Sequence, residues 1–343
     1  MEELLRLYED WRGCAPQSVE QLPGAGSNRT YYRFWDAEGD SLIGVVGTSR
    51  EENEAFIYLA GHFGQKRLPM PRVVAVSTSR LCYLQTDLGH RSLFDALSEG
   101  REKGGRYAPE EKELLRRTIA ELPRIQFVGA EGLDFGRCYP MASMDRTAVF
   151  FDLNYFKYCF LKLAGVEADE ERLENDFDRL TAKLVMAGAD GFMFRDFQSR
   201  NIMVVDNEVY FIDYQGGRQG ALHYDVASLL YDAIVKIPES QKEELLDFYI
   251  RELTESEPGY AEKFREIYYH FVLVRLLQAM GAFGLRGLHE GKSHFIDSIV
   301  PGLQGISTLF EPGKLEGEYP EIQYAIRVAF EKYFVPLHPE SKE

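Results

Sequence analysis

The chain has 343 residues, of which 45% are hydrophobic and 27% charged, a composition that excludes a fibrous or largely disordered protein. Its formal net charge of -16 argues against a nucleic-acid partner, because such binding depends on basic side chains that neutralise phosphates. A small anionic ligand in a local basic pocket remains compatible with this charge. At roughly 150 residues per domain, the length suggests two lobes.

The apolar stretches and the N-terminus give no sign of a membrane partner or of export. Residues 271–283, the most apolar late stretch, contain Arg275 and Gln278, so we expect no membrane-spanning helix. The N-terminus is acidic and amphipathic and lacks a signal-peptide pattern. The cysteines form no C-x-x-C pair and are expected to be reduced. We therefore expect a cytoplasmic protein.

Strand patterns dominate the first part of the chain. We predict strands over four segments, residues 29–35, 41–47, 73–76 and 81–85. The first two are joined by a polar turn and form a hairpin. A helix is expected over residues 50–63, because Phe56, Leu59 and Phe63 fall on one face.

Helical patterns dominate after Gly89. We predict helices over residues 109–127, 147–163, 170–186, 239–253, 260–283 and 321–334. Residues 87–91 lie between the two regions and are a candidate hinge. The chain is therefore predicted to be an α+β protein, with a small antiparallel-sheet lobe over residues 1–87 and a larger helical lobe over residues 88–343.

One β-hairpin interrupts the helical part. Two apolar runs, residues 201–205 and 208–212, flank the turn pair Asp206-Asn207, which is a strong hairpin signal. A hairpin brings its outer ends together, so we expect Asn201 and Asp213 to be neighbours.

The mouth of this hairpin carries the residues that a phosphoryl-transfer site needs. Asp196 and Asn201 have a D-x-x-x-x-N spacing, and Asp213 follows. Such a site requires a carboxylate that orients or deprotonates the attacking hydroxyl, and oxygen ligands that hold Mg²⁺. We assign Asp196 as the catalytic base, and Asn201 and Asp213 as magnesium ligands. The alternative is a polar loop with an Asx turn.

Three stretches of the sequence are similar to the motifs of a known family. They read Arg-Asp-Phe-Gln-Ser-Arg-Asn-Ile-Met-Val from residue 195, Phe-Ile-Asp-Tyr-Gln-Gly from residue 211 and Tyr-Asp-Val-Ala-Ser-Leu-Leu from residue 224. The sequence resembles the aminoglycoside phosphotransferase and choline kinase group, which implies a two-lobed protein-kinase-like fold, with ATP and Mg²⁺ as cofactors. It also implies that Asp225 braces the catalytic loop.

Further stretches narrow the resemblance to bacterial kinases that phosphorylate the anomeric hydroxyl of N-acetylmuramate and N-acetylglucosamine. These stretches are residues 151–156, 276–284 and 291–295. The resemblance implies an amino-sugar substrate and a role in recycling cell-wall sugars. Two alternatives stay open: a kinase of an aminoglycoside, choline or another small alcohol, and a catalytically weak nucleotide-binding scaffold.

The sequence departs from the family pattern at two places. Phe194 stands where the family usually has a histidine, which puts the rigidity of the catalytic loop in question. The strand over residues 41–47 lacks the lysine that usually holds the nucleotide phosphates. Arg33 or Arg29 is the candidate substitute, and a solvated strand arginine is the alternative. Glu54 lies where the family has an acidic helix residue.

The remaining site residues follow from the resemblance by position. A small-residue loop before the first predicted strand is expected to contact phosphate through its backbone, and the segment before the hinge to contact adenine. The nucleotide-binding candidates are Gly26, Ser27, Asn28, Arg33, Gln85 and Asp87. The candidates for binding the sugar are Asp152, Asn154, Tyr155 and Arg200. For the small-residue loop a simple turn is the alternative, and for Asp152, Asn154 and Tyr155 an ordinary amphipathic helix.

Overall fold

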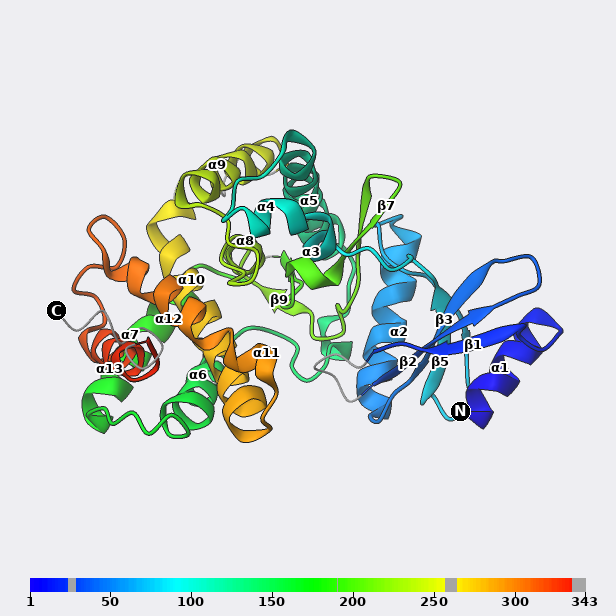
Figure 1. Ribbon diagram of the computed structural model, residues 1–343, viewed down its shortest axis with the longest axis horizontal. Helices are drawn as coiled ribbons and strands as arrows, with labels where there is room; N and C mark the ends of the chain where they lie inside the picture. Colours follow the sequence, from blue (N-terminus) through cyan, green and yellow to red (C-terminus); the bar gives the residue numbers. More distant parts are fainter. Residues whose placement is uncertain (24–28, 190, 257–263, 335–343) are drawn as a thin grey trace. The chain divides into compact units, whose positions relative to one another are not determined.

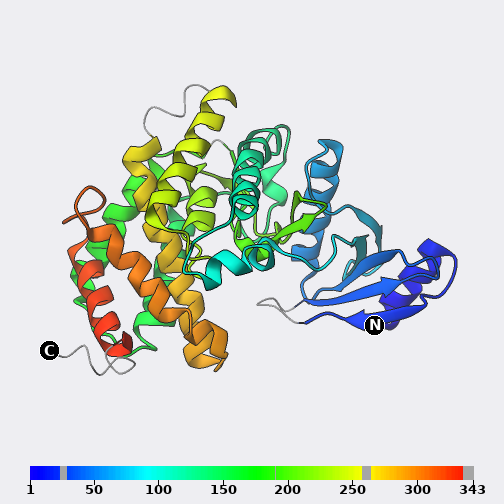
Figure 2. The same ribbon diagram turned by 45° about the horizontal axis from the view of Figure 1, so that its top comes forward.

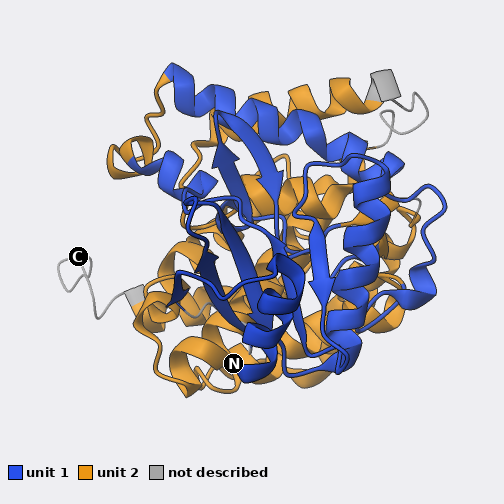
Figure 3. Ribbon diagram, turned by 90° about the vertical axis from the view of Figure 1, so that its right-hand side faces the viewer, with its two compact units in different colours: residues 1–98, 109–142, 194–218 blue, residues 99–108, 143–193, 219–343 orange. Residues whose placement is uncertain are grey.

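A computed structural model describes residues 1–23, 29–189, 191–256 and 264–334. The chain forms two compact units that alternate along the sequence (Figure 3). Unit 1 consists of Met1–Ser98, Pro109–Ala142 and Phe194–Arg218, and unit 2 of Glu99–Ala108, Ser143–Met193 and Gln219–Glu343. Segments beyond residue 87 thus group with the N-terminal sheet, and a lobe boundary at that residue stays a prediction.

Unit 1 is built on a five-stranded antiparallel sheet in the order β1-β2-β3-β5-β4 (Figure 1). Its strands are β1 (Ser18–Gln21), β2 (Thr30–Trp35), β3 (Ser41–Val46), β4 (Val73–Val76) and β5 (Cys82–Thr86). The four predicted strands agree with β2 to β5 to within about one residue at each end. The strand β1 was not predicted, because its four residues are all exposed and show no alternation.

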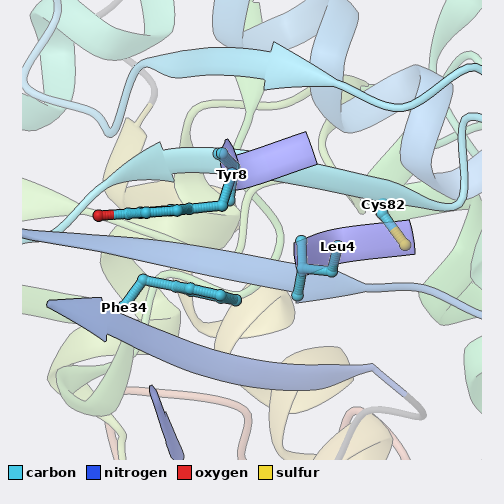
Figure 4. Close-up of a cluster of buried hydrophobic side chains, with 5 residues drawn as sticks. Leu4, Tyr8, Phe34 and Cys82 are labelled. Carbon is cyan, nitrogen blue, oxygen red and sulfur yellow. The ribbon is translucent and has the colours of Figure 1, made fainter. Parts of the chain in front are cut away.

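Helix α1 (Glu2–Arg12) covers one face of this sheet. Its Leu4 and Tyr8 pack with Phe34, Cys82 and Leu84 in a buried cluster, and the rings of Tyr8 and Phe34 stack with centroids 5.0 Å apart (Figure 4). All three strand residues have even numbers, as expected when alternate side chains point to one face.

The other face of the sheet carries the odd-numbered side chains of β2, β3 and β5. Helix α2 (Arg50–Gln65) packs here, and the ring of Phe56 stacks on that of Tyr83 with centroids 5.0 Å apart. Ser49 caps the helix by accepting a hydrogen bond from the backbone N–H of Glu52. By alternation along β2, Tyr31 and Arg33 lie on this same face.

The rest of unit 1 comprises helices of different lengths, 3₁₀ turns and one hairpin. These are α3 (Leu93–Ala96), the long α5 (Pro109–Val128), the 3₁₀ turns Phe135–Arg137 and Ser199–Asn201, and the strands β7 (Ile202–Val205) and β8 (Glu208–Phe211). The predicted hairpin is confirmed. Asp206 and Asn207 adopt φ values of 52° and 64°, as a two-residue turn of this kind requires.

Unit 2 is mainly helical, and α10 lies at its centre, with α6, α7, α8 and α12 packed against it (Figure 2). Its helices are α6 (Arg146–Phe156), α7 (Glu170–Val185), α8 (His223–Leu230), α9 (Glu239–Ser256), α10 (Phe264–Phe283), α11 (Ser293–Ile296), α12 (Ile299–Ser307) and α13 (Pro320–Phe334). The short helix α4 (Ser98–Glu102) begins at the end of a unit 1 segment. The strands β6 (Gly191–Met193) and β9 (Arg218–Gly220) form a separate two-stranded sheet.

Two helices of unit 2 continue into π-helical turns. Helix α6 continues over Lys157–Leu161, and α10 over Gly284–His289. By length and composition alone, the continuous helix Phe264–His289 could cross a membrane, but 56% of its most apolar window is buried in the fold. Such burial is typical of a core helix.

Candidate active site

The mouth of the β7–β8 hairpin brings two of the predicted residues together. Asn201 comes directly before β7, and Asp213 follows β8. The ladder extends to this end, since the N–H of Ile212 donates to the carbonyl oxygen of Asn201 at 2.9 Å. The side-chain Nδ2 of Asn201 lies 3.4 Å from Oδ2 of Asp213. The expected neighbourhood of these two residues is therefore confirmed.

Asp196 joins the same cluster through its backbone. Nδ2 of Asn201 donates to the main-chain oxygen of Asp196 at 2.9 Å, which leaves Oδ1 of Asn201 as the acceptor atom of that amide. The carboxylate of Asp196 lies against Gly216, where a Cβ atom would be 3.6 Å from Oδ2. Because Gly216 has no side chain, no Cβ atom occupies this position beside the carboxylate.

The backbone is strained on both sides of the cluster. Arg195 has a φ of 80° and Asp213 a φ of 68°, in the left-handed region that non-glycine residues seldom adopt. Each such residue costs on the order of 1–3 kcal/mol, and such residues are concentrated at functional sites. The strain falls directly before Asp196 and at Asp213 itself, a pattern that agrees with the prediction of a functional site here.

The electrostatics of the cluster favour a cation. Burial, and then the Asp196 carboxylate, raise the pKa of Asp213, while a hydrogen bond from Nε2 of Gln215 to its Oδ1 at 2.8 Å opposes that rise. Burial and then the negative charge of Asp213 raise the pKa of Tyr31 to about 12. Two carboxylates and an amide oxygen within one cluster are the hard oxygen donors that fit a divalent ion such as Mg²⁺.

The family model described as the phosphotransferase enzyme family matches residues 18–262, a range that includes this cluster. The chain belongs to the phosphotransferase enzyme family. It is accordingly a phosphotransferase that uses a hydroxyl group as acceptor.

Two relatives within the phosphotransferase family are similar over most of the chain. The N-acetylmuramate/N-acetylglucosamine kinase of Pseudomonas aeruginosa (strain PAO1) is 23% identical over 331 residues, which cover 92% of this chain and 93% of that protein. The protein of the same name from Neisseria meningitidis serogroup B (strain MC58) is 25% identical over 277 residues, which cover 78% of each chain.

A solved structure shows the fold that this phosphotransferase adopts. The choline kinase LicA from Streptococcus pneumoniae matches with a TM-score of 0.59 at 13% identity, covering 88% of this chain and 98% of that chain. The predicted α+β, protein-kinase-like fold is confirmed.

Phe194, which replaces the usual histidine of the phosphotransferase family, is part of an aromatic cluster. It is fully buried and makes edge contacts with Phe197, Phe211 and Tyr214, at centroid distances of 5.5, 6.3 and 6.2 Å. Packing of this kind stabilises the loop that carries Asp196 without a histidine. The phenylalanine therefore leaves the loop with defined support.

Arg33 and Asp87, both predicted to bind the nucleotide, bind one another. Nε of Arg33 is 2.5 Å from Oδ2 of Asp87, and its Nη2 donates to Oδ1 of Asp87 and to the carbonyl oxygen of Gly89, at 3.2 and 2.8 Å. Ser41 also donates to Asp87. These contacts of Arg33 join β2 to the segment that follows β5, so in this structure both side chains hold parts of unit 1 together.

Arg29 and Glu52 form a pair that the sequence did not indicate. Nη2 of Arg29 lies 3.3 Å from Oε1 of Glu52, and the Arg29 side chain is only 2% exposed. Glu54, the acidic residue expected on this helix, instead pairs with Arg50 on an exposed helix surface. Both glutamates lie on α2, but Glu52 is four residues before the buried Phe56 and shares its face, a helical signal that favours Glu52 over the exposed Glu54.

The other nucleotide candidates have different surroundings. Gly26, Ser27 and Asn28 lie outside the residues that the structure describes. Gln85 lies within the sheet, where β5 pairs it with Ile43 on β3 and Val73 on β4. It therefore precedes the end of β5, and its contact with adenine stays a prediction.

Three of the substrate candidates lie on α6 of unit 2. Asp152 is buried, whereas Asn154 and Tyr155 are half-buried. The ring of Tyr155 packs closely on α10, since a Cβ atom on Gly281 would lie 2.6 Å from it. Their contact with a sugar stays a prediction.

Arg200 and Asp225 complete the predicted set. Arg200 belongs to unit 1 and is exposed, and its guanidinium lies over the ring of Phe94, 4.8 Å from the centroid. Asp225 lies in the first turn of α8 in unit 2 and is fully buried. The predicted bracing role of Asp225 is not tested by this placement.

Proposed function

We propose that the chain catalyses the transfer of the γ-phosphoryl group of ATP, with Mg²⁺, to the anomeric hydroxyl of N-acetylmuramate or N-acetylglucosamine. The observation that carries the proposal is the cluster of Asp196, Asn201 and Asp213 at the hairpin mouth, with Asn201 bonded to one aspartate and adjacent to the other. A cytoplasmic location and a role in recycling cell-wall sugars are parts of the same proposal.

Asp196 is the proposed general base. Its carboxylate accepts the proton of the acceptor hydroxyl while the oxygen forms a bond to the γ-phosphorus and the bond from phosphorus to the bridging oxygen breaks. The products are the sugar phosphate and ADP. A Cβ atom at Gly216 would be in van der Waals contact with Oδ2 of Asp196, at 3.6 Å, so a larger side chain there would take up space beside this carboxylate.

Asn201 and Asp213 are the proposed ligands of Mg²⁺, through Oδ1 of the amide and the carboxylate. When bound, the ion neutralises the negative charge that develops on the phosphate oxygens. Nδ2 of Asn201 is held by the backbone of Asp196, which orients the amide before any ligand arrives. Gln215 holds the carboxylate of Asp213 in the same way.

Support for an amino-sugar acceptor comes from the two relatives, which match this chain over 92% and 78% of its length at low identity. The residues proposed to bind the sugar are Asp152, Asn154, Tyr155 and Arg200. The four cysteines are all unpaired, which agrees with a reducing compartment.

An assay of ADP release tests the proposal. Purified protein is incubated with ATP and Mg²⁺ and with each of five compounds: N-acetylmuramate, N-acetylglucosamine, its 1-O-methyl glycoside, choline and an aminoglycoside. We expect one ADP per free amino sugar and none with the methyl glycoside, whose reacting oxygen is blocked. Equal rates on the glycoside and the free sugar would contradict anomeric chemistry. Turnover of choline or the aminoglycoside alone would show that the acceptor is a compound of that class and not an amino sugar.

A further inference from the structure

The nucleotide of the proposed reaction is a polyanion, and the described charges around Asp213 are mostly negative. The carboxylate of Asp213 interacts electrostatically with the carboxylates of Asp196 and Glu52 and with the Arg29 guanidinium. A site of this kind needs a fixed positive charge for the phosphates. The lysine that usually supplies this charge is missing from β3.

Two other basic residues of unit 1, Lys66 and Arg33, are engaged in other contacts. Lys66, the one lysine among the first 90 residues, lies after α2 and pairs with Glu131 at 3.0 Å. Arg33 forms a fork with Asp87 and donates to Gly89. Because both nitrogens of this fork are engaged with a carboxylate, Arg33 is poorly suited to hold a phosphate.

Arg29 has the surroundings of a positioned cation. It comes one residue before β2 and, by alternation, lies on the sheet face that carries Tyr31, with which its side chain is hydrogen-bonded. Glu52 holds it from α2, with Nη2 3.3 Å from Oε1 of Glu52 and 3.4 Å from the main-chain oxygen. The ring of Phe56 lies beneath its guanidinium, 5.6 Å from the centroid.

We propose that Arg29, held by Glu52, contacts the phosphates of the nucleotide and replaces the missing strand lysine. This inference rests on the proposed function, since it assumes an ATP site beside Asp213. A guanidinium can hold two phosphate oxygens through a planar pair of N–H groups, a fixed geometry that a lysine ammonium lacks. The pair of Arg29 on the sheet and Glu52 on α2 reproduces the strand-lysine and helix-glutamate pair of kinase sites in a different sequence position.

Nucleotide affinity without any sugar is the test, so a wrong acceptor does not affect it. Isothermal calorimetry compares a non-hydrolysable ATP analogue, with Mg²⁺, against adenosine. Arg29→Met keeps the packing on Phe56 and removes the charge. We expect it to bind the analogue about 10- to 100-fold more weakly than wild type, with adenosine affinity unchanged, because a charge-assisted contact is lost.

Two controls separate phosphate binding from structural support. Glu52→Gln should weaken binding of the analogue, whereas Glu54→Gln, at an exposed site on the same helix, should not. If Arg29→Met does not fold, Arg29→Lys carries the test. It keeps the charge without the fork, and its preference for the analogue over adenosine should fall about threefold or more.

Three results would overturn the assignment: an unchanged preference for the analogue in the folded Arg29 variant, an equal loss of analogue and adenosine affinity, or a wild-type protein that binds no analogue. The last result would also reject the proposed function. Binding of the analogue with no turnover of any amino sugar would reject only the acceptor and leave the Arg29 assignment in place.

Discussion

Asn201 donates from Nδ2 to the main-chain oxygen of Asp196 at 2.9 Å and lies 3.4 Å from Oδ2 of Asp213. One amide therefore links the proposed base to the proposed metal carboxylate. A small shift of the 3₁₀ turn Ser199–Asn201 would therefore change both distances together.

Replacing the proposed base should stop turnover and spare nucleotide binding. Asp196→Asn removes the proton acceptor but keeps the size of the side chain, and the Asn201 contact is to the backbone. We expect kcat to fall about 10²- to 10⁴-fold, as is typical when a general base is lost. Steady-state assays and calorimetry with an ATP analogue measure the two effects. A variant with wild-type kcat would show that another group takes the proton.

Replacing the proposed metal carboxylate should change the Mg²⁺ dependence. Asp213→Asn removes a charged ligand from the cluster, so higher Mg²⁺ should restore activity only in part. A titration of activity against Mg²⁺ measures the shift. Asp206→Asn, in the exposed turn of the same hairpin, is the matched control, because asparagine tolerates the φ of 52° found there. Identical titration curves for the two variants would contradict the assignment of Asp213.

The N-acetyl group of the sugar should contribute more than the lactyl group if both amino sugars are substrates. A buried amide that loses its partner costs about 1–3 kcal/mol, so glucose should show roughly a 5- to 150-fold lower kcat/KM than N-acetylglucosamine. Asp152, Asn154 and Tyr155 are the positions to change in search of this contact. Tyr158→Phe, an exposed residue in the turn after α6, is the control for Tyr155→Phe. Equal kcat/KM for glucose and N-acetylglucosamine would remove the support for an amide contact.

Acid should destabilise the protein partly through His223. Its ring stacks on those of Phe264 and Phe271, with centroids 3.8 and 4.9 Å apart, and burial lowers the pKa of His223 to about 3. The unfolded chain binds this proton near pH 6.5 and the folded chain does not, so the free energy of unfolding falls as the pH drops below 6.5.

The size of this effect can be measured by urea unfolding. Between pH 6.5 and pH 5 the histidine should cost about 2 kcal/mol, at about 1.4 kcal/mol per pH unit. His223→Phe keeps an aromatic ring in the stack and cannot be protonated. Its loss of unfolding free energy between pH 7.5 and pH 5 should be smaller than that of wild type by this amount. An equal loss in both proteins would show that His223 titrates normally in the fold.

The proximity of Asn201 and Asp213 could be predicted because it depends on short-range signals. The Asp206-Asn207 turn fixes the register of the hairpin, and the register places Asn201 next to Asp213. Helix α2 and the strands β2 to β5 were likewise recognised from the period of their apolar residues. These features need no knowledge of distant parts of the chain.

The partners of charged residues could not be predicted in this way. Arg29 and Arg33 lie on one strand face, so the sequence does not say which carboxylate each of them meets. The structure pairs Arg33 with Asp87 and Arg29 with Glu52, because α2 and the end of β5 approach different parts of β2. The strand β1 was also missed, since its only structural signal is its ladder with β2.

The thiol of Cys82 can serve as a reporter for the movement of α1. It is 3% exposed in the cluster beneath Leu4 and Tyr8, and burial raises its pKa, so in the closed state a labelling reagent reaches it only slowly. The rate at which Cys82 reacts, in a protein whose other cysteines have been replaced, therefore counts how often α1 lifts from the sheet. Measured with and without a nucleotide, this rate indicates whether ligand binding on one face of the sheet alters local opening on the other.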